Sequence, residues 1–244
     1  MTALPSPTSP VRRCADTLES GSSVDVHQIL ADGDHVVVEH TGHNRRRPGL
    51  RQQLLLDLPY RLAAPKWQFL CHAADRGGFV LHGTGNPDIT TFEPRQSNDV
   101  DDFGNRCAVY AASDGLWPMY FAILARDRYD MGLTNACIQL VGVEGSYYFF
   151  SISRSALDQQ PWRDGIVYLL PADTFETQKS IMDGDQEIRT AQVASLTPVR
   201  PAAKLHVGPG DFPFLQAIRG HDNEVLRARA AADPAGFPWI DSSD

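Results

Sequence analysis

The chain has 244 residues, of which 42% are apolar and 21% charged, and a formal net charge of −8. These values are typical of a soluble globular protein with an ordinary core. The acidic balance weighs against general nucleic-acid binding, because phosphate contacts normally need a clustered basic surface. The 17 prolines and 19 glycines favour many turns and a β-rich body.

Residues 1–24 are rich in Pro, Ser and Thr and are predicted to form a flexible N-terminal arm. Residues 25–64 are predicted to be an appendage packed on the main domain, with a strand at His35–His40. The leucine-rich stretch Arg51–Arg61 fits a helix or a strand, and its periodicity does not decide between them. The main domain is expected over residues 65–235, followed by a C-terminal tail over residues 236–244.

The first half of the main domain is predicted to contain two helices and one strand. Pro65–Arg76 has apolar residues on one helical face and stops at a Gly-Gly pair. Phe79–His82 is predicted to be a short buried strand, followed by a loop over Gly83–Pro87. Asp114–Arg126 is predicted to be a helix, with Ser113 or Asp114 as its N-cap.

From Ala136 onward the pattern is that of a series of strands, followed by helical segments near the end. The strands are predicted at Cys137–Val141, Tyr147–Ile152, Gly165–Pro171, Thr190–Leu196 and Lys204–Val207. The helical segments are predicted at Phe214–Ile218 and Asn223–Ala232. Helices followed by several short strands indicate an α+β domain with a split, mostly antiparallel β-sheet. No glycine-rich Rossmann turn or phosphate-binding loop is present.

Signals for metals, membranes and export are missing from the sequence. The four cysteines form no C-x-x-C pair, and none has a histidine at zinc-ligand spacing, so no metal site and no disulfide framework are predicted. The N-terminus lacks a charged start followed by an apolar core, and no apolar run approaches the roughly 18 residues of a membrane helix. We therefore expect a cytoplasmic protein without a membrane partner.

Three positions are candidates for ligand chemistry. His82 ends an apolar strand just before Gly83, where a ligand can approach the backbone. Tyr110 is flanked by alanines that leave room for a flat ring to stack. Glu187 follows a polar turn and starts a strand-like run, so its carboxylate could stabilise a cationic sugar. Each residue also has an ordinary alternative: a capping histidine, a core tyrosine and a solvated acid.

In this order the three positions resemble the His–Tyr–Glu triad of the ADP-ribosyltransferase superfamily, in the branch that includes the poly(ADP-ribose) polymerases. In that branch a strand ends in His-Gly-Ser or His-Gly-Thr, an aromatic strand and a helix with a stacking aromatic follow, and a single Glu begins a late strand. Leu81–Thr84 is similar to the first motif, Val109–Ala111 to the second and Gln186–Ile188 to the third. The resemblance covers about residues 79 to 207 and implies the superfamily's fold, a split, mostly antiparallel sheet with flanking helices.

The resemblance implies that NAD is the co-substrate, that ADP-ribose is transferred to an acceptor and that nicotinamide is released. His82, Tyr110 and Glu187 would be the catalytic residues, with Glu187 gripping the ribose beside the scissile bond. Tyr110 and an aromatic of the following helix would sandwich the nicotinamide ring. The residues implied to contact NAD are His82, Gly83, Thr84, Tyr110, Ser113, Tyr120 and Phe121.

The sequence departs from the family's pattern at three points, and these leave alternatives open. Ala111 stands where the family often has Phe, and the stacking aromatic is either Tyr120 or Phe121. Glu176 competes with Glu187 for the role of the acid. A non-catalytic module that binds NAD or ADP-ribose is one alternative. An enzyme similar to the RNA 2′-phosphotransferases, which share the fold and rely on Arg and His in place of the Glu, is another. The acceptor, whether protein, nucleic acid or small molecule, stays open.

Overall fold

The computed structural model of the chain describes residues 55–97, 99, 101–234 and 236–240. Within this part the protein has a mixed α and β architecture in which two β-sheets dominate. The predicted arm over residues 1–24 and the predicted strand His35–His40 lie outside the described residues.

The larger sheet has eight strands, in the order β1-β12-β7-β2-β4-β11-β8 with β3 attached to β4. All of its neighbouring strands are antiparallel except β1 and β12, which run parallel. In chain order its strands are β1 (Leu56–Asp57), β2 (Phe79–Thr84), β3 (Arg95–Gln96), β4 (Cys107–Ala112), β7 (Gly165–Pro171), β8 (Glu176–Thr177), β11 (Gln192–Ser195) and β12 (Ala203–Val207).

The smaller sheet has five strands, in the order β13-β6-β5-β10-β9. Its pairs are antiparallel except β13 with β6. Its strands are β5 (Leu133–Leu140), β6 (Tyr147–Ser153), β9 (Ile181–Asp183), β10 (Gln186–Thr190) and β13 (Arg219–His221).

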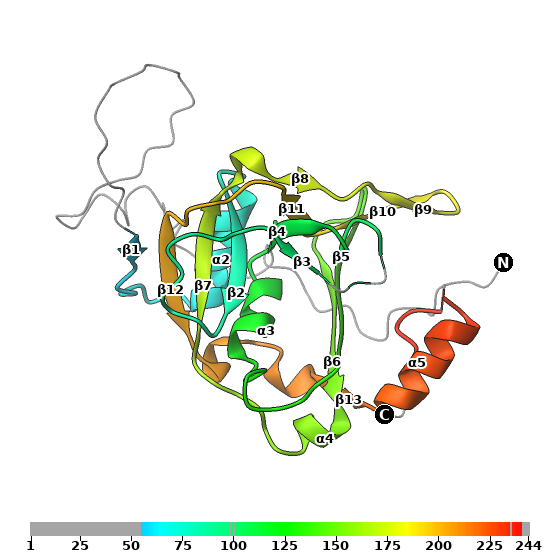
Figure 1. Cartoon of the computed structure of the whole chain (residues 1–244). Helices are drawn as coiled ribbons and strands as arrows, with labels where there is room; N and C mark the ends of the chain where they lie inside the picture. Colours follow the sequence, from blue (N-terminus) through cyan, green and yellow to red (C-terminus); the bar gives the residue numbers. More distant parts are fainter. Residues whose placement is uncertain (1–54, 98, 100, 235, 241–244) are drawn as a thin grey trace.

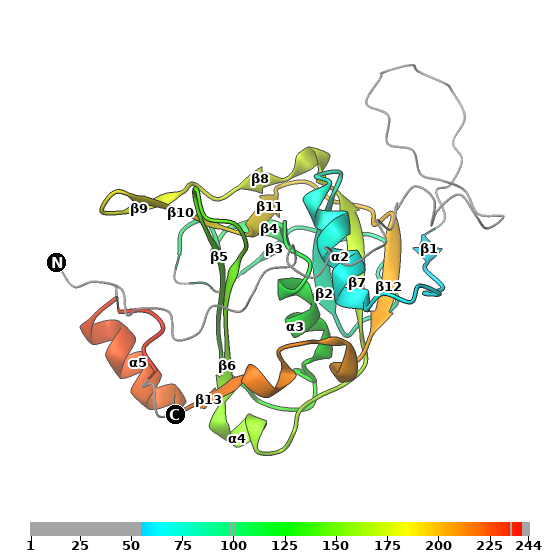
Figure 2. The ribbon, with the colours of Figure 1, turned by 180° about the vertical axis from the view of Figure 1, so that it is seen from behind.

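One helix joins the two sheets. The short helix α3 (Trp117–Ile123) lies between β2 and β7 on one side and β6 on the other (Figures 1 and 2). The Tyr120 ring of α3 packs 4.8 Å from the Phe150 ring of β6, between ring centroids. The other helices are α2 (Lys66–Asp75), α4 (Arg154–Leu157), α5 (Asn223–Ala232) and the 3₁₀ turns η2 (Ala172–Thr174), η3 (Pro209–Asp211) and η4 (Leu215–Ala217).

The larger sheet has a hydrophobic cluster on each face. The cluster on the helix side joins α2, α3 and the inner faces of both sheets, and includes Leu70, Leu81, Met119, Ile152 and Leu205. The cluster on the opposite face lies under the segment that follows β2, and includes Val80, Phe92, Val109, Ala111 and Tyr168. Alternation along β2 therefore sends Val80 and Leu81 to different cores.

Most of the predicted elements are confirmed. The helices over Pro65–Arg76 and Asn223–Ala232 correspond to α2 and α5, and the strand Gly165–Pro171 has the predicted bounds. The other predicted strands correspond to β2, β5, β6, β11 and β12, and the leucine-rich stretch supplies β1. The mostly antiparallel pairing is confirmed as well. The described cysteines form no disulfide; Cys71 and Cys137 are buried and Cys107 is exposed.

Several boundaries were wrong for identifiable reasons. Gly83 and Thr84 belong to β2 and not to a loop, because they pair with Val167 and Ile166 of β7. The helix predicted over Asp114–Arg126 begins only at Trp117, and its N-cap position is Leu116, not Ser113 or Asp114. It stops at Ile123, because the next residue is extended and pairs with Trp162. The segment Phe214–Ile218 forms only the 3₁₀ turn η4. The helix α4 and the short strands β3, β8, β9 and β13 were missed.

Candidate functional site

The strand β2 carries the central part of the candidate site. It lies inside the larger sheet between β7 and β4, and its apolar residues Val80 and Leu81 are buried. The next three residues, His82, Gly83 and Thr84, are half-buried. Val80 and Leu81 thus fix the first half of the strand in the two hydrophobic clusters, and the His-Gly-Thr run lies closer to the surface.

The sheet splits at this run. The strand β2 follows β7 through six registered pairs, from Phe79–Pro171 to Thr84–Ile166. With β4, in contrast, it shares the single registered pair Leu81–Ala112. Beyond this pair the His82 imidazole takes the place of strand pairing, because its Nδ1 lies 2.7 Å from the carbonyl oxygen of Tyr110.

The bond to Tyr110 determines the tautomer of His82. A carbonyl only accepts, so Nδ1 carries the proton and Nε2 presents a lone pair in the neutral ring. Burial lowers the pKa of His82, and the hydrogen bond to Tyr110 opposes this shift without cancelling it. The ring is therefore neutral at physiological pH. Its Nε2 forms no hydrogen bond with another described residue, so it can accept one from a ligand hydroxyl.

His82 and Tyr110 point to different faces of the larger sheet. His82 has the same parity as Val80, and its ring lies 4.7 Å from the Phe92 ring, between centroids. Tyr110 is two residues from Ala112 in β4, so the two side chains lie on the same face of the sheet. Ala112 pairs with Leu81, whose side chain is on the helix side. The structure thus joins the two predicted residues through the Tyr110 backbone and separates their side chains.

The Tyr110 hydroxyl anchors the loop before β4. It donates toward the carbonyl oxygens of Phe103 and Arg106, at 2.9 and 3.1 Å, and accepts from the Arg106 amide at 2.7 Å. These bonds give Tyr110 a structural role that does not depend on a ligand.

Gly83 and Thr84 have different surroundings. A Cβ atom built on Gly83 would lie 1.7 Å from the Pro118 carbonyl oxygen, so α3 rests directly on this glycine. The Thr84 hydroxyl oxygen accepts from the Asn86 amide at 3.2 Å, and its proton can still be donated.

The two aromatic candidates in α3 are not equivalent. Tyr120 is fully buried, its hydroxyl donates to the Ser151 carbonyl, and its ring packs against Phe150 and Phe212. It has no open face for a nicotinamide ring. Phe121 is half-buried beside Tyr120 and Trp117, and of the two it is the one with accessible ring surface.

Ser113 and Gln192 lie next to Ala112, the residue of β4 that pairs with β2. Ser113 is exposed, and its amide donates to the Ala191 carbonyl at 2.8 Å. Gln192 begins β11 directly opposite Ala112, which in turn lies opposite Leu81. Gln192 is thus the polar side chain that β11 places on the face shared by Leu81 and Tyr110, and sequence reasoning missed it.

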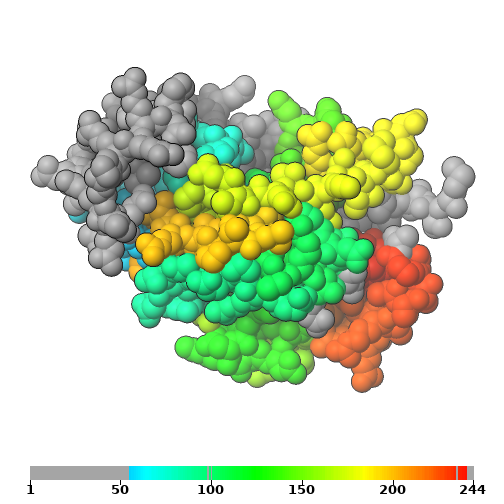
Figure 3. All heavy atoms as spheres, turned by 45° about the horizontal axis from the view of Figure 1, so that its top comes forward, coloured from blue at the N-terminus to red at the C-terminus, as the bar shows by residue number. Residues whose placement is uncertain are grey.

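The two candidate acids lie in different sheets. Glu187 is in β10 of the smaller sheet, where Arg189 binds one carboxylate oxygen through two nitrogens, at 3.0 and 3.1 Å. This bond is the main reason why the pKa of Glu187 is lowered. The adjoining strand β9 is exposed, as the yellow segment in Figure 3 shows.

Glu176 shares a sheet with Tyr110. It pairs with Ala194 of β11, and Ala194 pairs with Tyr110, so the three lie in one row on one face. Two strand spacings separate the ends of this row, about 10 Å. Glu176 also forms an ion pair with Arg106 at 3.2 Å, which ties it to the loop that Tyr110 anchors.

Sequence reasoning missed the residues that surround the His-Gly-Thr run. The Phe92 ring packs against both the His82 and the Tyr168 rings, and the Tyr168 hydroxyl donates to the Asn86 carbonyl and accepts from the Ile89 amide. Arg163 covers Gly85. The only local signal was the continuous apolar run of β7, which contains Tyr168; an arginine before a strand gives none.

The described residues contain no group of three or more His, Cys, Asp or Glu side chains placed to hold a metal ion. In the same part of the chain, no helix combines the length and apolar character that crossing a bilayer requires. Comparisons with protein-family models, curated proteins and solved structures found no match to this chain.

Proposed function

We propose that the protein binds NAD at the split between β2 and β4 and transfers its ADP-ribose to an acceptor, releasing nicotinamide. One observation carries the proposal. The neutral His82 ring is oriented by its hydrogen bond to the Tyr110 carbonyl, and its Nε2 lone pair is available where β2 and β4 separate. A ribose offers a hydroxyl donor for this lone pair and a hydroxyl oxygen that can accept from the neighbouring Thr84 hydroxyl. The order of the His-Gly-Thr, aromatic-strand and helix elements is the second support, and the fold of the superfamily is part of the same proposal.

The proposed reaction needs positioning and a negative charge more than proton transfer. The bond between the ribose C1′ and the nicotinamide nitrogen breaks, and its electron pair neutralises the pyridinium as nicotinamide leaves. A nucleophile of the acceptor then bonds to C1′ and loses its proton. A carboxylate beside the ribose stabilises the positive charge that develops on the sugar.

Glu176 and Glu187 are the candidates for this carboxylate. Glu176 is favoured because it lies in the same sheet as His82, while Glu187 lies in the other sheet. We expect the Glu176→Gln variant to lose about a hundredfold in nicotinamide release, which is typical when one electrostatic contact to the transition state is removed. Nicotinamide would be quantified chromatographically after incubation of the full chain with NAD.

The matched control is Glu187→Gln, which removes the same charge from the smaller sheet. Release that falls in this variant and persists in Glu176→Gln would reverse the assignment. Release that persists in both variants would contradict the role of either carboxylate. Circular dichroism of each variant separates loss of activity from loss of fold.

A non-catalytic NAD or ADP-ribose binding module is the second candidate. Both acids are paired with arginines, and the side chain that β11 presents beside the split, Gln192, is an uncharged amide. NAD binding by the wild type, lost in His82→Ala, without any nicotinamide release would favour this module. Loss of a phosphate from a 2′-phosphorylated RNA end would instead indicate the phosphotransferase reaction.

A further inference from the structure

The guanidinium group of Arg163 lies at the end of the His-Gly-Thr strand. A Cβ atom built on Gly85 would be 1.8 Å from Cζ of Arg163 and 2.0 and 2.2 Å from its two terminal nitrogens. The guanidinium therefore occupies the space that any side chain at position 85 would fill. Because Gly85 directly follows Thr84, a positive charge is fixed next to the residues proposed to hold a ribose.

Arg163 has unused hydrogen-bonding capacity. One terminal nitrogen donates to the Asp127 carboxylate at 2.5 Å, while Nε is buried without a partner among the described residues. A buried donor without an acceptor costs free energy, so a further acceptor here would be stabilising. The geometry of the guanidinium group suits the oxygens of a phosphate, which it can bind through two parallel N–H bonds.

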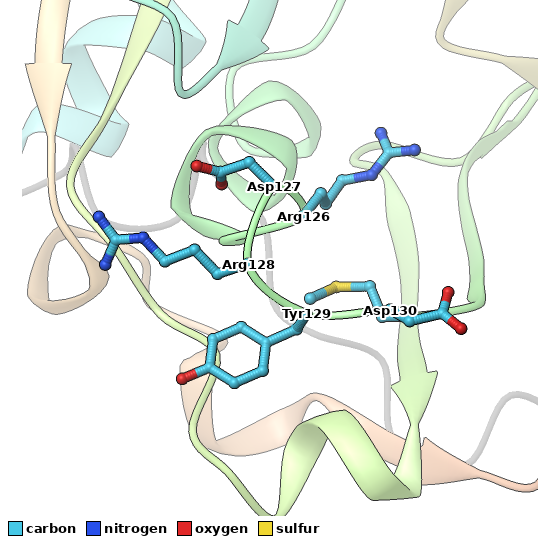
Figure 4. Close-up of a pocket in the computed structure, with 6 residues that line it drawn as sticks. Arg126, Asp127, Arg128, Tyr129 and Asp130 are labelled. Carbon is cyan, nitrogen blue, oxygen red and sulfur yellow. The ribbon is translucent and has the colours of Figure 1, made fainter.

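Asp127 is an exchangeable counter-ion. Its side chain is 60% exposed, whereas that of Arg163 is 19% exposed. The aspartate lies on a surface turn that lines a cavity of about 370 Å³, together with Arg126, Arg128, Tyr129, Asp130 and Met131 (Figure 4). Arg163 does not line this cavity, so an anion would reach the guanidinium by replacing the exposed Asp127 carboxylate.

The two arginines that line this cavity, Arg126 and Arg128, do not form a converging site. Arg126 and Arg128 extend from the turn in opposite directions (Figure 4). Each adds positive charge at the cavity, whereas the guanidinium that lies against Gly85, at the end of the His-Gly-Thr strand, is that of Arg163. An anion at the end of the His-Gly-Thr strand would therefore be bound by Arg163.

We propose that the Arg163 guanidinium binds the pyrophosphate of the dinucleotide, and that the Asp127 carboxylate binds the guanidinium when no anion is present. The identity of this ligand rests on the proposed function; the anion site itself rests on the geometry of Arg163. Asp127 then acts as an internal competitor that keeps the guanidinium in position over Gly85.

The test uses the full chain and inorganic pyrophosphate as the probe, in calorimetric titrations at low ionic strength, where charge pairs are least screened. We expect Arg163→Ala to weaken pyrophosphate binding by about tenfold or more, as for loss of a hydrogen bond to a charged group. We expect Asp127→Asn to strengthen binding, because the asparagine oxygen can still accept from the guanidinium but no longer competes with an anion by its charge. A purely structural Arg163–Asp127 pair would not produce opposite effects from its two partners.

Two further variants complete the design. Gly85→Ala keeps Arg163 but places a methyl group where its guanidinium lies, so it should also weaken binding. Arg227→Ala, at an exposed position of α5, is the control for loss of one positive charge and should leave binding unchanged. Equal affinity of the wild type, Arg163→Ala and Asp127→Asn, or no binding by any of them, would overturn the proposal.

The two proposals fail separately. Nicotinamide release with an unchanged KM for NAD in Arg163→Ala would refute the pyrophosphate role and leave the transferase intact. Pyrophosphate binding that depends on Arg163, without nicotinamide release by the wild type, would refute the transferase and leave an anion site.

Discussion

Replacing Gly83 by alanine is expected to destabilise the protein by about 3 kcal/mol or more, the upper end of the cost of overpacking a core. The new methyl group would lie 1.7 Å from the carbonyl oxygen of Pro118 and 2.6 Å from its carbonyl carbon. These are backbone atoms of α3, which cannot move aside by a change of rotamer. The whole helix would have to shift away from β2, and with it the Tyr120 side chain that joins the two sheets. Urea unfolding followed by circular dichroism measures the effect.

Other glycines provide the comparison. Gly165 in the neighbouring strand β7 makes the same kind of approach, since its added Cβ would lie 2.0 Å from the Ala122 carbonyl oxygen. Gly165→Ala should therefore be destabilising as well. Gly78 and Gly210 have nothing within 4 Å of an added Cβ and no left-handed backbone. Their alanine variants should be neutral or gain up to about 1 kcal/mol by restricting the unfolded chain. A Gly83→Ala variant as stable as these controls would contradict the close packing of the α3 backbone against Gly83.

Gly83 also illustrates what the sequence could and could not predict about the site. A glycine after a strand histidine indicated close approach by some group, and sequence reasoning assigned that approach to a ligand. In the structure the Pro118 carbonyl of α3 makes it. The local signal, a missing Cβ, is the same for both, so only the packing of a segment 35 positions later could distinguish them.

Elements with local signals were predicted well. The α5 helix has an N-cap aspartate, Asp222, whose carboxylate accepts from the Glu224 and Val225 amides, and its predicted bounds are confirmed. The strand β7 is a continuous apolar run ended by proline, which marks a buried strand in any context. The short strands β8 and β9 have exposed residues and exist because a partner strand pairs with them. No local pattern predicts such strands.

The two candidate acids also differ in how far the local sequence predicts their ion pairs. The Arg189 partner of Glu187 is two residues away on the same strand face, so strand periodicity alone could have suggested the pair. The Arg106 partner of Glu176 is 70 residues away in sequence and depends on the register of β4, β11 and β8. The single sequence therefore offered two acids without showing which one shares a sheet with Tyr110.

Replacing Asp114 by alanine is the second change with a large expected effect, a loss of about 3 kcal/mol or more. Asp114 is 7% exposed, and its carboxylate accepts from the Tyr148 hydroxyl at 2.5 Å and from the Leu116 and Trp117 amides at 2.8 and 2.7 Å. Alanine would leave these donors without an acceptor at the start of α3. Tyr148→Phe is the graded control: it removes one donor and keeps the hydrogen bonds from the Leu116 and Trp117 amides to Asp114, and it should cost about 1 to 2 kcal/mol. Equal stability of Asp114→Ala and wild type in urea would contradict a stabilising role of the Asp114 carboxylate.

The ionisation of Asp114 adds a pH dependence with a definite sign. Burial raises the pKa of Asp114, and the hydrogen bonds from Tyr148, Trp117 and Leu116 oppose this shift without cancelling it. Between the ordinary carboxyl pKa, about 4, and the raised value, the folded state binds more protons than the unfolded state. The contribution of this group to stability is therefore complete below about pH 4 and decreases as pH rises to the raised pKa, above which it is lost. Asp114→Asn has no proton to lose at this position, so its free energy of unfolding should fall less steeply than that of the wild type across the window. Parallel profiles of the two proteins would show that Asp114 titrates with the same pKa in the folded and unfolded states.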